Sequence, residues 1–179
     1  MNISLSWLRD YIETDLTADE IAKILTSIGL EVGHISEFES IKGGLEGLVV
    51  GEVKTCVKHE NSDHLHVTTV DVGAGEPLQI VCGAANIAQG QKVVVATVGT
   101  KLYGSDESFT IKRSKIRGVE SFGMICAEDE IGVGKSHDGI IVLPSETTVG
   151  TLAKDYYRVE TDTVIEVDIT PNRSDAISH

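Results

Sequence analysis

The sequence has 179 residues, an apolar fraction of 41% and a formal net charge of −13. This length and apolar fraction allow one or two packed domains, while the acidic excess argues against general affinity for nucleic acid, because phosphate binding needs local positive charge. Three distant cysteines with no CxxC pair indicate neither a disulfide framework nor a cysteine zinc site, and no apolar run is long enough to span a membrane.

The first 40 residues predict two helices and a strand. Apolar residues at helical spacing predict a short helix over Leu5–Glu13. Thr17 and Glu20 form a capping box, which predicts the start of a second helix, with an apolar face made of Ile21, Ile24, Leu25 and Ile28. Gly29 is expected to end this helix in a left-handed conformation, and Glu31–Phe38 follows as a strand. A unit this short cannot bury a core alone.

After a flexible joint at Lys42–Gly44, the hydrophobic pattern changes to a period of two. Val49–Lys58 is predicted to be a half-buried antiparallel strand, with Val49, Gly51, Val53, Thr55 and Val57 on one face. Further short strands are expected at Leu65–Val72, Pro77–Cys82, Lys92–Val98, Phe109–Ile116, Gly123–Cys126 and Asp138–Leu143, with a short helical turn at Ala127–Ile131. Several short strands at this spacing predict a small barrel.

The last 30 residues return to a mixed pattern. A short helical face at Leu152–Tyr156 precedes an alternating strand at Thr163–Thr170, whose apolar face holds Ile165, Val167 and Ile169. Pro171–Asp175 is expected to be a turn that leads into a helix capped by Ser174 or Asp175. Because the chain stops one turn into that helix, we expect the sequence to be part of a longer protein.

Three phrases carry a resemblance to a known family: IVCGAAN at Ile80–Asn86, IRGVESFGMICAEDEIG at Ile116–Gly132 and HENSDHL at His59–Leu65. In this order they resemble the tRNA-binding OB-fold module. That module is found in bacterial phenylalanyl-tRNA synthetase beta subunits, in the C-terminal extension of methionyl-tRNA synthetases and in free-standing tRNA-binding proteins. In the third phrase Glu60, Ser62 and His64 depart from the family's usual Pro, Ala and Lys. Both flanks, residues 1–32 and 164–179, resemble the beta subunit.

The resemblance implies an α+β fold, in which a five-stranded OB-fold barrel over residues 41–150 is inserted into a small split α/β domain made of residues 1–40 and 151–179. The chain would be the non-catalytic N-terminal part of the beta subunit of a cytoplasmic α2β2 ligase, which attaches phenylalanine to tRNA(Phe) with ATP and magnesium. The implied partners are tRNA(Phe), the alpha subunit and the remainder of the beta subunit. For this part we expect no cofactor, no metal, no DNA and no membrane.

The candidates for phosphate contact are Lys112, Arg113, Lys115 and Arg117, four cations within six residues. If the segment is one strand, Arg113, Lys115 and Arg117 share a face and form a cationic stripe, while Lys112 points away. Lysines on a solvated edge strand also discourage aggregation, so that interpretation remains open.

Ser121 and Met124 are the next candidates, because the resemblance places them at the RNA-facing surface. A hydroxyl can bond phosphate or ribose, and a methionine can lie against a base. Alternatively, Gly123 permits a tight turn and Met124 packs the barrel. Asn86 is expected to be structural, bonding the backbone of its own turn.

A metal site and a catalytic site are both disfavoured. The residues His59, Glu60, Asp63, His64 and His66 are too crowded for zinc, and no second ligand cluster follows. No nucleophile–base pair or carboxylate dyad is evident. Two hypotheses compete with the tRNA-binding one: a purely structural docking module without RNA contact, and a free-standing tRNA-binding protein, which the flanks disfavour.

Overall fold

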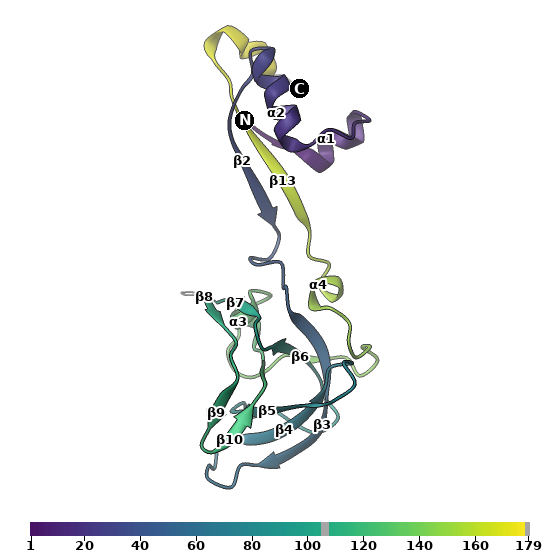
Figure 1. Cartoon of the computed structure of the whole chain (residues 1–179), viewed down its shortest axis with the longest axis vertical. Helices are drawn as coiled ribbons and strands as arrows, with labels where there is room; N and C mark the ends of the chain where they lie inside the picture. Colours follow the sequence, from purple (N-terminus) through teal and green to yellow (C-terminus); the bar gives the residue numbers. More distant parts are fainter. Residues whose placement is uncertain (105–107, 178–179) are drawn as a thin grey trace. The chain divides into compact units, whose positions relative to one another are not determined.

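The structure is a computed structural model that describes residues 1–104 and 108–177. Two compact units divide the chain, and both contain regular secondary structure (Figure 1). Unit 1 comprises Met1–Ser40 and Glu160–His179, and unit 2 comprises Ile41–Val159. The chain passes from unit 1 to unit 2 after Ser40 and returns to unit 1 before Glu160. Unit 2 is therefore one continuous segment inserted into the sequence of unit 1.

Unit 1 is a three-stranded antiparallel sheet with two α-helices, in the strand order β1–β13–β2. Its elements are β1 (Asn2–Ser4), α1 (Leu5–Tyr11), α2 (Ala18–Ser27), β2 (Glu31–Glu39), β13 (Thr161–Asp168) and the 3₁₀ helix η1 (Pro171–Ile177). Its core has four buried residues, Leu5, Ile21, Ile165 and Val167. The two helices each contribute one of these residues and the central strand β13 contributes two.

The sequence patterns of unit 1 are confirmed in most places. The predicted capping box opens α2: Thr17 Oγ1 accepts from Glu20 N, and Glu20 accepts from Thr17 N. Gly29 follows α2 with a φ of +90°, the left-handed conformation expected there. Along β13, Ile165 and Val167 are buried while their neighbours are more exposed. The C-terminal expectation differs, because a 3₁₀ helix starts directly at Pro171 and is kinked at Arg173.

Unit 2 is mostly antiparallel sheet with few helices, and the sheet forms a nearly closed barrel (Figure 1). Its main path runs β11–β6–β3–β4–β5, and β12 also pairs with β6. The strands are β3 (Leu48–Lys58), β4 (His66–Asp71), β5 (Leu78–Cys82), β6 (Lys92–Thr97), β7 (Lys101–Tyr103), β8 (Ser108–Thr110), β9 (Ser114–Ile116), β10 (Val119–Ser121), β11 (Gly123–Ile125) and β12 (Val142–Leu143). The helices are α3 (Glu128–Ile131) and α4 (Ala153–Tyr156).

Hydrogen bonds across the two ends of this path draw the barrel together. Phe122 N donates to Gln79 O at 2.9 Å, and Gln79 Nε2 donates to Glu120 O at 2.8 Å. These contacts join β5 at one end of the path to β10 and to Phe122, which directly precedes β11 at the other end. The small barrel expected from short, evenly spaced strands is therefore confirmed in outline, and β4, β5, β6 and β11 each lie within one residue of their predicted bounds.

The predicted antiparallel strand Val49–Lys58 is present as β3, but its burial differs from the one-sided pattern that was predicted. Val50 and Val53 are both fully buried, but they belong to different core clusters on the two faces of the sheet. A register shift between Val53 and Thr55 then changes the alternation, and Val57 is exposed. The prediction failed because the barrel interior covers one face of β3 while α4 and neighbouring loops cover the other.

The predicted strand Phe109–Ile116 is also not continuous. It is divided into β8 and β9 by a segment in which Ile111 turns inward. Ile111 N donates to Thr100 O at 2.8 Å, and Ile111 O accepts from Gly99 N at the same distance. The cations after Ile111 therefore do not lie on one continuous strand. The prediction that Arg113, Lys115 and Arg117 share one strand face is wrong.

Candidate nucleic-acid interface

A groove of about 720 Å³ on unit 2 is bordered by two of the family-like phrases. One wall is the end of β5 and the turn after it, from Val81 to Ala85. Another is the segment around Lys112 and the start of β11, and a third is formed by Glu130 and the loop Asp138–Ile140. The floor is largely apolar, with Ile111, Met124, Ile125 and Ile140 among its residues.

Asn86 fixes the turn that forms the first wall. Its side-chain amide donates to Ile140 O and accepts from Ile140 N, both at 3.0 Å. This bidentate bond joins the turn after β5 to the loop before β12, which lies on the opposite side of the groove. Asn86 is thus structural, as expected, but it holds a second loop rather than its own turn.

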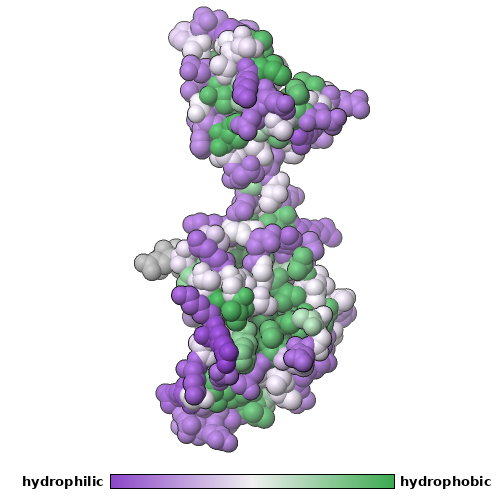
Figure 2. Space-filling view, viewed as in Figure 1, coloured by the Kyte–Doolittle hydropathy of each residue, from purple (hydrophilic) through white to green (hydrophobic). Residues whose placement is uncertain are grey.

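Two of the four candidate cations make no ion pair within the part of the chain that the structure describes. Lys112 lies at the groove, Lys115 lies on β9, and both side chains are exposed. In Figure 2 the surface of unit 2 shows strongly hydrophilic side chains beside apolar ones over the segment that leads into β9. A lysine without a partner remains available to a phosphate.

The two arginines are already engaged. Arg113 pairs with Glu120 on β10, and its guanidinium lies 5.0 Å from the centroid of the Phe122 ring. Arg117 adopts a left-handed backbone conformation (φ +46°), and its Nη1 donates to Asn61 O at 2.8 Å. Arg113 therefore ties the two strands of the β9–β10 hairpin together, and Arg117 joins the hairpin to the loop at Asn61.

His59 makes a second connection between the same two segments. It is buried, its Nδ1 accepts from Asn61 N at 3.0 Å, and its Nε2 lies 3.3 Å from Ile116 O. Since Nδ1 is an acceptor, Nε2 carries the proton and donates to Ile116 O. The loop after β3 and the hairpin β9–β10 are thus clamped by His59 and Arg117, which we call the hairpin clamp.

Ser121 and Met124 both border the groove, but they are less exposed than the lysines. Ser121 is 2% exposed; its hydroxyl accepts from Val81 N at 3.1 Å and donates to Gly123 O at 3.0 Å. Met124 is half-buried and packs against the core cluster. A Cβ on Gly123 would lie 2.9 Å from Ala96 O, so glycine permits the close approach of β11 to β6.

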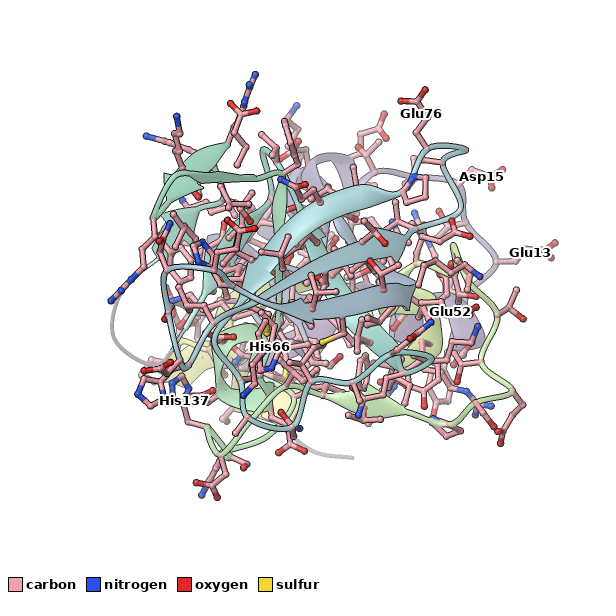
Figure 3. The ribbon with its side chains drawn as sticks, turned by 90° about the horizontal axis from the view of Figure 1, so that it is seen from below. Glu13, Asp15, Glu52, His66, Glu76 and His137 are labelled. Carbon is pink, nitrogen blue, oxygen red and sulfur yellow. The ribbon has the colours of Figure 1, made fainter. Side chains whose placement is uncertain are left out.

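The groove's third wall is acidic, with one histidine. His137 Nδ1 lies 3.0 Å from Asp129 Oδ1, and this hydrogen bond together with the carboxylate charge raises the pKa of His137. Figure 3 shows His137 at the periphery. Glu130 accepts from Ala127 N and so caps α3. Carboxylates repel phosphate, so this wall is unfavourable for a polyanion.

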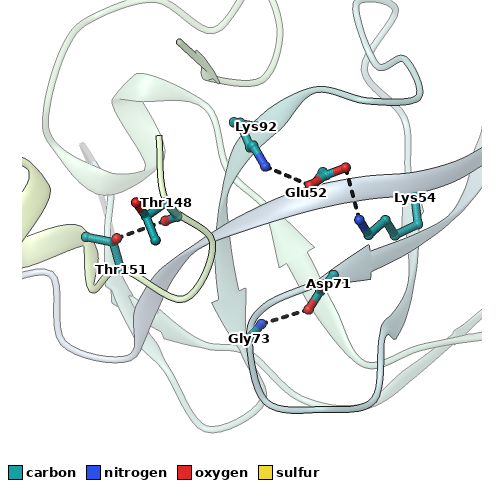
Figure 4. Close-up of polar contacts among 7 residues, drawn as sticks. All are labelled: Glu52, Lys54, Asp71, Gly73, Lys92, Thr148 and Thr151. Carbon is teal, nitrogen blue, oxygen red and sulfur yellow. Dashed lines mark hydrogen bonds and ion pairs between the residues drawn. The ribbon is translucent and has the colours of Figure 1, made fainter. Parts of the chain in front are cut away.

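Two other lysines of the barrel, Lys54 and Lys92, share an acidic partner. Glu52 on β3 binds Lys92 Nζ at 2.7 Å and Lys54 Nζ at 3.1 Å (Figure 4). The hydrogen bonds from Lys92 and then Lys54 lower the pKa of the Glu52 carboxyl. This cluster lies outside the residues that border the groove.

Nothing at the groove resembles a catalytic or metal centre. Cys82 borders it, but burial raises the pKa of that thiol, so it is a poor nucleophile at neutral pH. No group of three metal-ligating side chains occurs within residues 1–104 and 108–177, and no helix in that part of the chain is long and apolar enough to cross a membrane.

Sequence reasoning missed two features of this surface. It did not predict the acidic wall, although the acidic run Glu128–Glu130 is evident in the sequence. The wall forms only because tertiary contacts bring the loop at Asp138 next to Glu130. It also counted Arg117 among the candidates for phosphate contact without foreseeing its bond to Asn61 O. The adjacent Gly118 (φ +94°) signals a tight turn, and that signal could have indicated a structural role.

The comparisons with known proteins cover both units. The family model described as a putative tRNA binding domain matches residues 48–152, which lie within unit 2. The chain is 72% identical over 179 residues to a phenylalanine–tRNA ligase beta subunit of Bacteroides fragilis, and 47% identical over 180 residues to that of Fusobacterium nucleatum. All of this chain is aligned in both cases, but it spans only 22% of the length of each relative.

A solved structure gives a partial match. A methionyl-tRNA-synthetase-related protein from Pyrococcus horikoshii aligns with 57% of this chain and 84% of its own, with 28% identity and a TM-score of 0.42. The family model covers more than half of the chain and coincides with the barrel that carries the groove. The chain therefore belongs to the family of putative tRNA binding domains.

Proposed function

We propose that unit 2 binds tRNA through Lys112, which borders the groove, and Lys115, which lies beside it on strand β9. The observation that carries this proposal is the coincidence of the family match, residues 48–152, with a barrel in which these two lysines have no ion pair among the described residues. The ammonium groups would contact backbone phosphates, and the hairpin clamp would hold β9 so that Lys115 is correctly placed. Ser121 and Met124 border the same groove, within reach of a ribose or base that follows the backbone.

For the domain organisation we propose a five-stranded OB-fold barrel inserted into a small split α/β domain. The main path of five strands, β11–β6–β3–β4–β5, supports the barrel assignment. The discontinuous composition of unit 1 supports the insertion. Unit 2 ends at Val159 rather than at residue 150. The segment 151–159, which contains α4, packs with the barrel core.

The longer protein, in this proposal, is the beta subunit of a phenylalanine–tRNA ligase, of which this chain is the non-catalytic N-terminal part. The 72% identity over the whole chain supports it. The complete enzyme would then be the cytoplasmic α2β2 ligase that joins phenylalanine to tRNA(Phe) with ATP and magnesium. Its alpha subunit and the remainder of its beta subunit would be the protein partners.

The test is a tRNA-binding titration by fluorescence anisotropy at several salt concentrations. Replacing Lys112 and Lys115 by Ala should weaken binding about tenfold or more and reduce the slope of log K against log salt by roughly 1.5, because two phosphate contacts are lost. A matched variant with Lys23→Ala and Lys54→Ala has the same net charge and should keep the slope of the wild type.

Two outcomes contradict the proposal. If the wild type shows no salt-dependent binding, the barrel is a docking module without RNA contact, which its net acidity would explain. If both double variants lose affinity equally, binding depends on overall charge and not on these two lysines.

A further inference from the structure

Unit 1 exposes every aromatic side chain that it has. The exposed fractions are 73% for Trp7, 86% for Tyr11 and 51% for Phe38. Trp7 is the only tryptophan of the sequence. Large aromatic side chains are usually among the most buried groups of a domain and dominate the energetics of cores and interfaces. Three of them in water on one small unit need an explanation.

Trp7 is a neighbour of each of the other two side chains, and we call the three together the aromatic face. Trp7 and Tyr11 are four residues apart on α1, so they project from the same side of that helix. Trp7 and Phe38 border the same hollow, of about 660 Å³, beside the start of β13. The remaining residues around this hollow are Asn2, Ser4, Ser6, Glu160, Thr161, Asp162 and Val164.

Unit 1 has more exposed than buried large hydrophobic side chains, which is unusual for a domain that folds independently. Its core has four buried residues, whereas eight of its large hydrophobic side chains are exposed among the described residues. Besides the aromatic face these are Met1, Ile12, Leu16, Ile24 and Ile28. Exposed apolar side chains in this number, beside so small a core, are typical of a surface that another segment or molecule covers.

Charge restricts what can cover the aromatic face. Unit 1 has 13 acidic and 3 basic residues, so it carries −10 of the total charge of −13. Asp162 in the hollow is ionised at neutral pH: partial burial opposes ionisation, but hydrogen bonds from Ser4, Ser6 and Thr163 lower its pKa. Nucleic acid, an anionic membrane and a second copy of this unit would all be repelled.

We propose that the aromatic face docks on an apolar protein surface rimmed by lysine and arginine, and that this surface belongs to the same polypeptide beyond these 179 residues. The proposal rests on the proposed function in one respect, namely that the chain is part of a longer beta subunit. This chain spans 22% of the length of its relatives, so their remaining sequence is long enough to supply such a docking surface. The aromatic side chains would be anchors, and the acidic rim would select a basic partner.

The experiment is site-specific photocrosslinking in the assembled full-length enzyme. The change Tyr11→benzoylphenylalanine replaces one exposed aromatic ring by another, and a second sample carries the probe at Phe38. After irradiation the crosslinked peptides are identified by mass spectrometry. We expect both probes to crosslink to neighbouring peptides of the same polypeptide outside residues 1–179, close to lysine or arginine. A probe at Tyr156, an exposed tyrosine of unit 2, should not label those peptides.

Crosslinks to the other subunit, to tRNA or to a second copy would overturn the proposal, and so would the absence of any crosslink. A second measurement uses Trp7→Ser, which removes an exposed ring and should leave unit 1 folded. Amide exchange of residues 5–12 should accelerate at least about tenfold in the assembled enzyme and remain unchanged in the 179-residue chain, because only the assembled face loses an anchor. tRNA binding by the 179-residue chain should be unaffected, so this result is independent of the Lys112 and Lys115 titration.

Discussion

Arg117 is a charged residue whose side chain is committed to the protein itself. Its guanidinium bonds Asn61 O, and its backbone is held in a left-handed conformation that costs free energy for any residue except glycine. Such strain is tolerated because the hairpin clamp needs the side chain at that position. Arg113, held by Glu120 and Phe122, is a similar case.

We predict that Arg117→Ala lowers the free energy of unfolding of unit 2 by about 1 kcal/mol, because a charge-assisted hydrogen bond is lost while the backbone strain remains. Arg117→Gly loses the same bond but relieves the strain, so it should be the more stable of the two variants. Denaturant unfolding measures both. If Arg117 were instead a phosphate ligand, both variants would reduce the salt slope of tRNA binding as Lys115→Ala does; we expect that slope to be unchanged.

His137 provides a prediction on pH. Its hydrogen bond to Asp129 and the charge of that carboxylate raise the pKa of the imidazole. Because the pKa of His137 is higher in the folded than in the unfolded protein, protonated His137 stabilises the fold. This contribution is fully present below the pKa of the unfolded state, about 6.5, and is lost as the pH rises through the pKa of the folded state. In Asp129→Asn the pKa of His137 should fall toward its usual value, as NMR titration of the ring protons would show. An unchanged titration curve would mean that the pair does not form in solution.

At the scale of elements, α2 shows how local chemistry fixes a boundary. Thr17 and Glu20 satisfy each other's backbone N–H groups at the start of the helix, and Gly29 follows its end with a positive φ. The apolar spacing of α2 then directs Ile21 to the core of unit 1. These features depend on residues three or four apart, which is why the sequence predicted them.

Thr17→Ala should destabilise unit 1 by about 1 kcal/mol, because the N-cap hydroxyl is lost. Thr17→Ser keeps the hydroxyl and serves as the control, with a stability close to that of the wild type. Urea unfolding followed by the fluorescence of Trp7 reports on unit 1 alone, since Trp7 is the single tryptophan. Equal losses in the two variants would show that the methyl group, and not the cap, is responsible.

At the scale of the whole molecule, the two units have separate cores. Unit 1 is built on Ile165 and its neighbours, whereas unit 2 has two clusters, one of which contains Leu102. No residue belongs to the core clusters of both units among the described residues. Packing of this kind allows each unit to lose its structure without the other.

We therefore expect Ile165→Ala and Leu102→Ala to act on different units. Each removes a fully buried side chain and should cost roughly 2–5 kcal/mol in its own unit. Hydrogen exchange followed by mass spectrometry would resolve the effect segment by segment. If either variant accelerates exchange equally in both units, the two cores are coupled and the chain unfolds as one body.

The sequence by itself determined the short-range features and the family. Alternation predicted β4, β5, β6 and β11 to within a residue at each end, and the capping box predicted the start of α2, because both depend only on neighbouring residues. The three family-like phrases indicated the tRNA-binding module, and the family match bears this out.

Tertiary structure decided the features that depend on contacts between distant residues. It divided the predicted Phe109–Ile116 strand where Ile111 bonds Thr100, and it buried the first half of β3 on both faces. Of the four candidate cations, Lys112 and Lys115 have no ion pair among the described residues, whereas Arg113 and Arg117 have protein partners. It also exposed Trp7, Tyr11 and Phe38, which composition alone would have placed in a core. A local pattern shows which residues share a face, but the partner that covers that face comes from elsewhere in the chain or from another molecule.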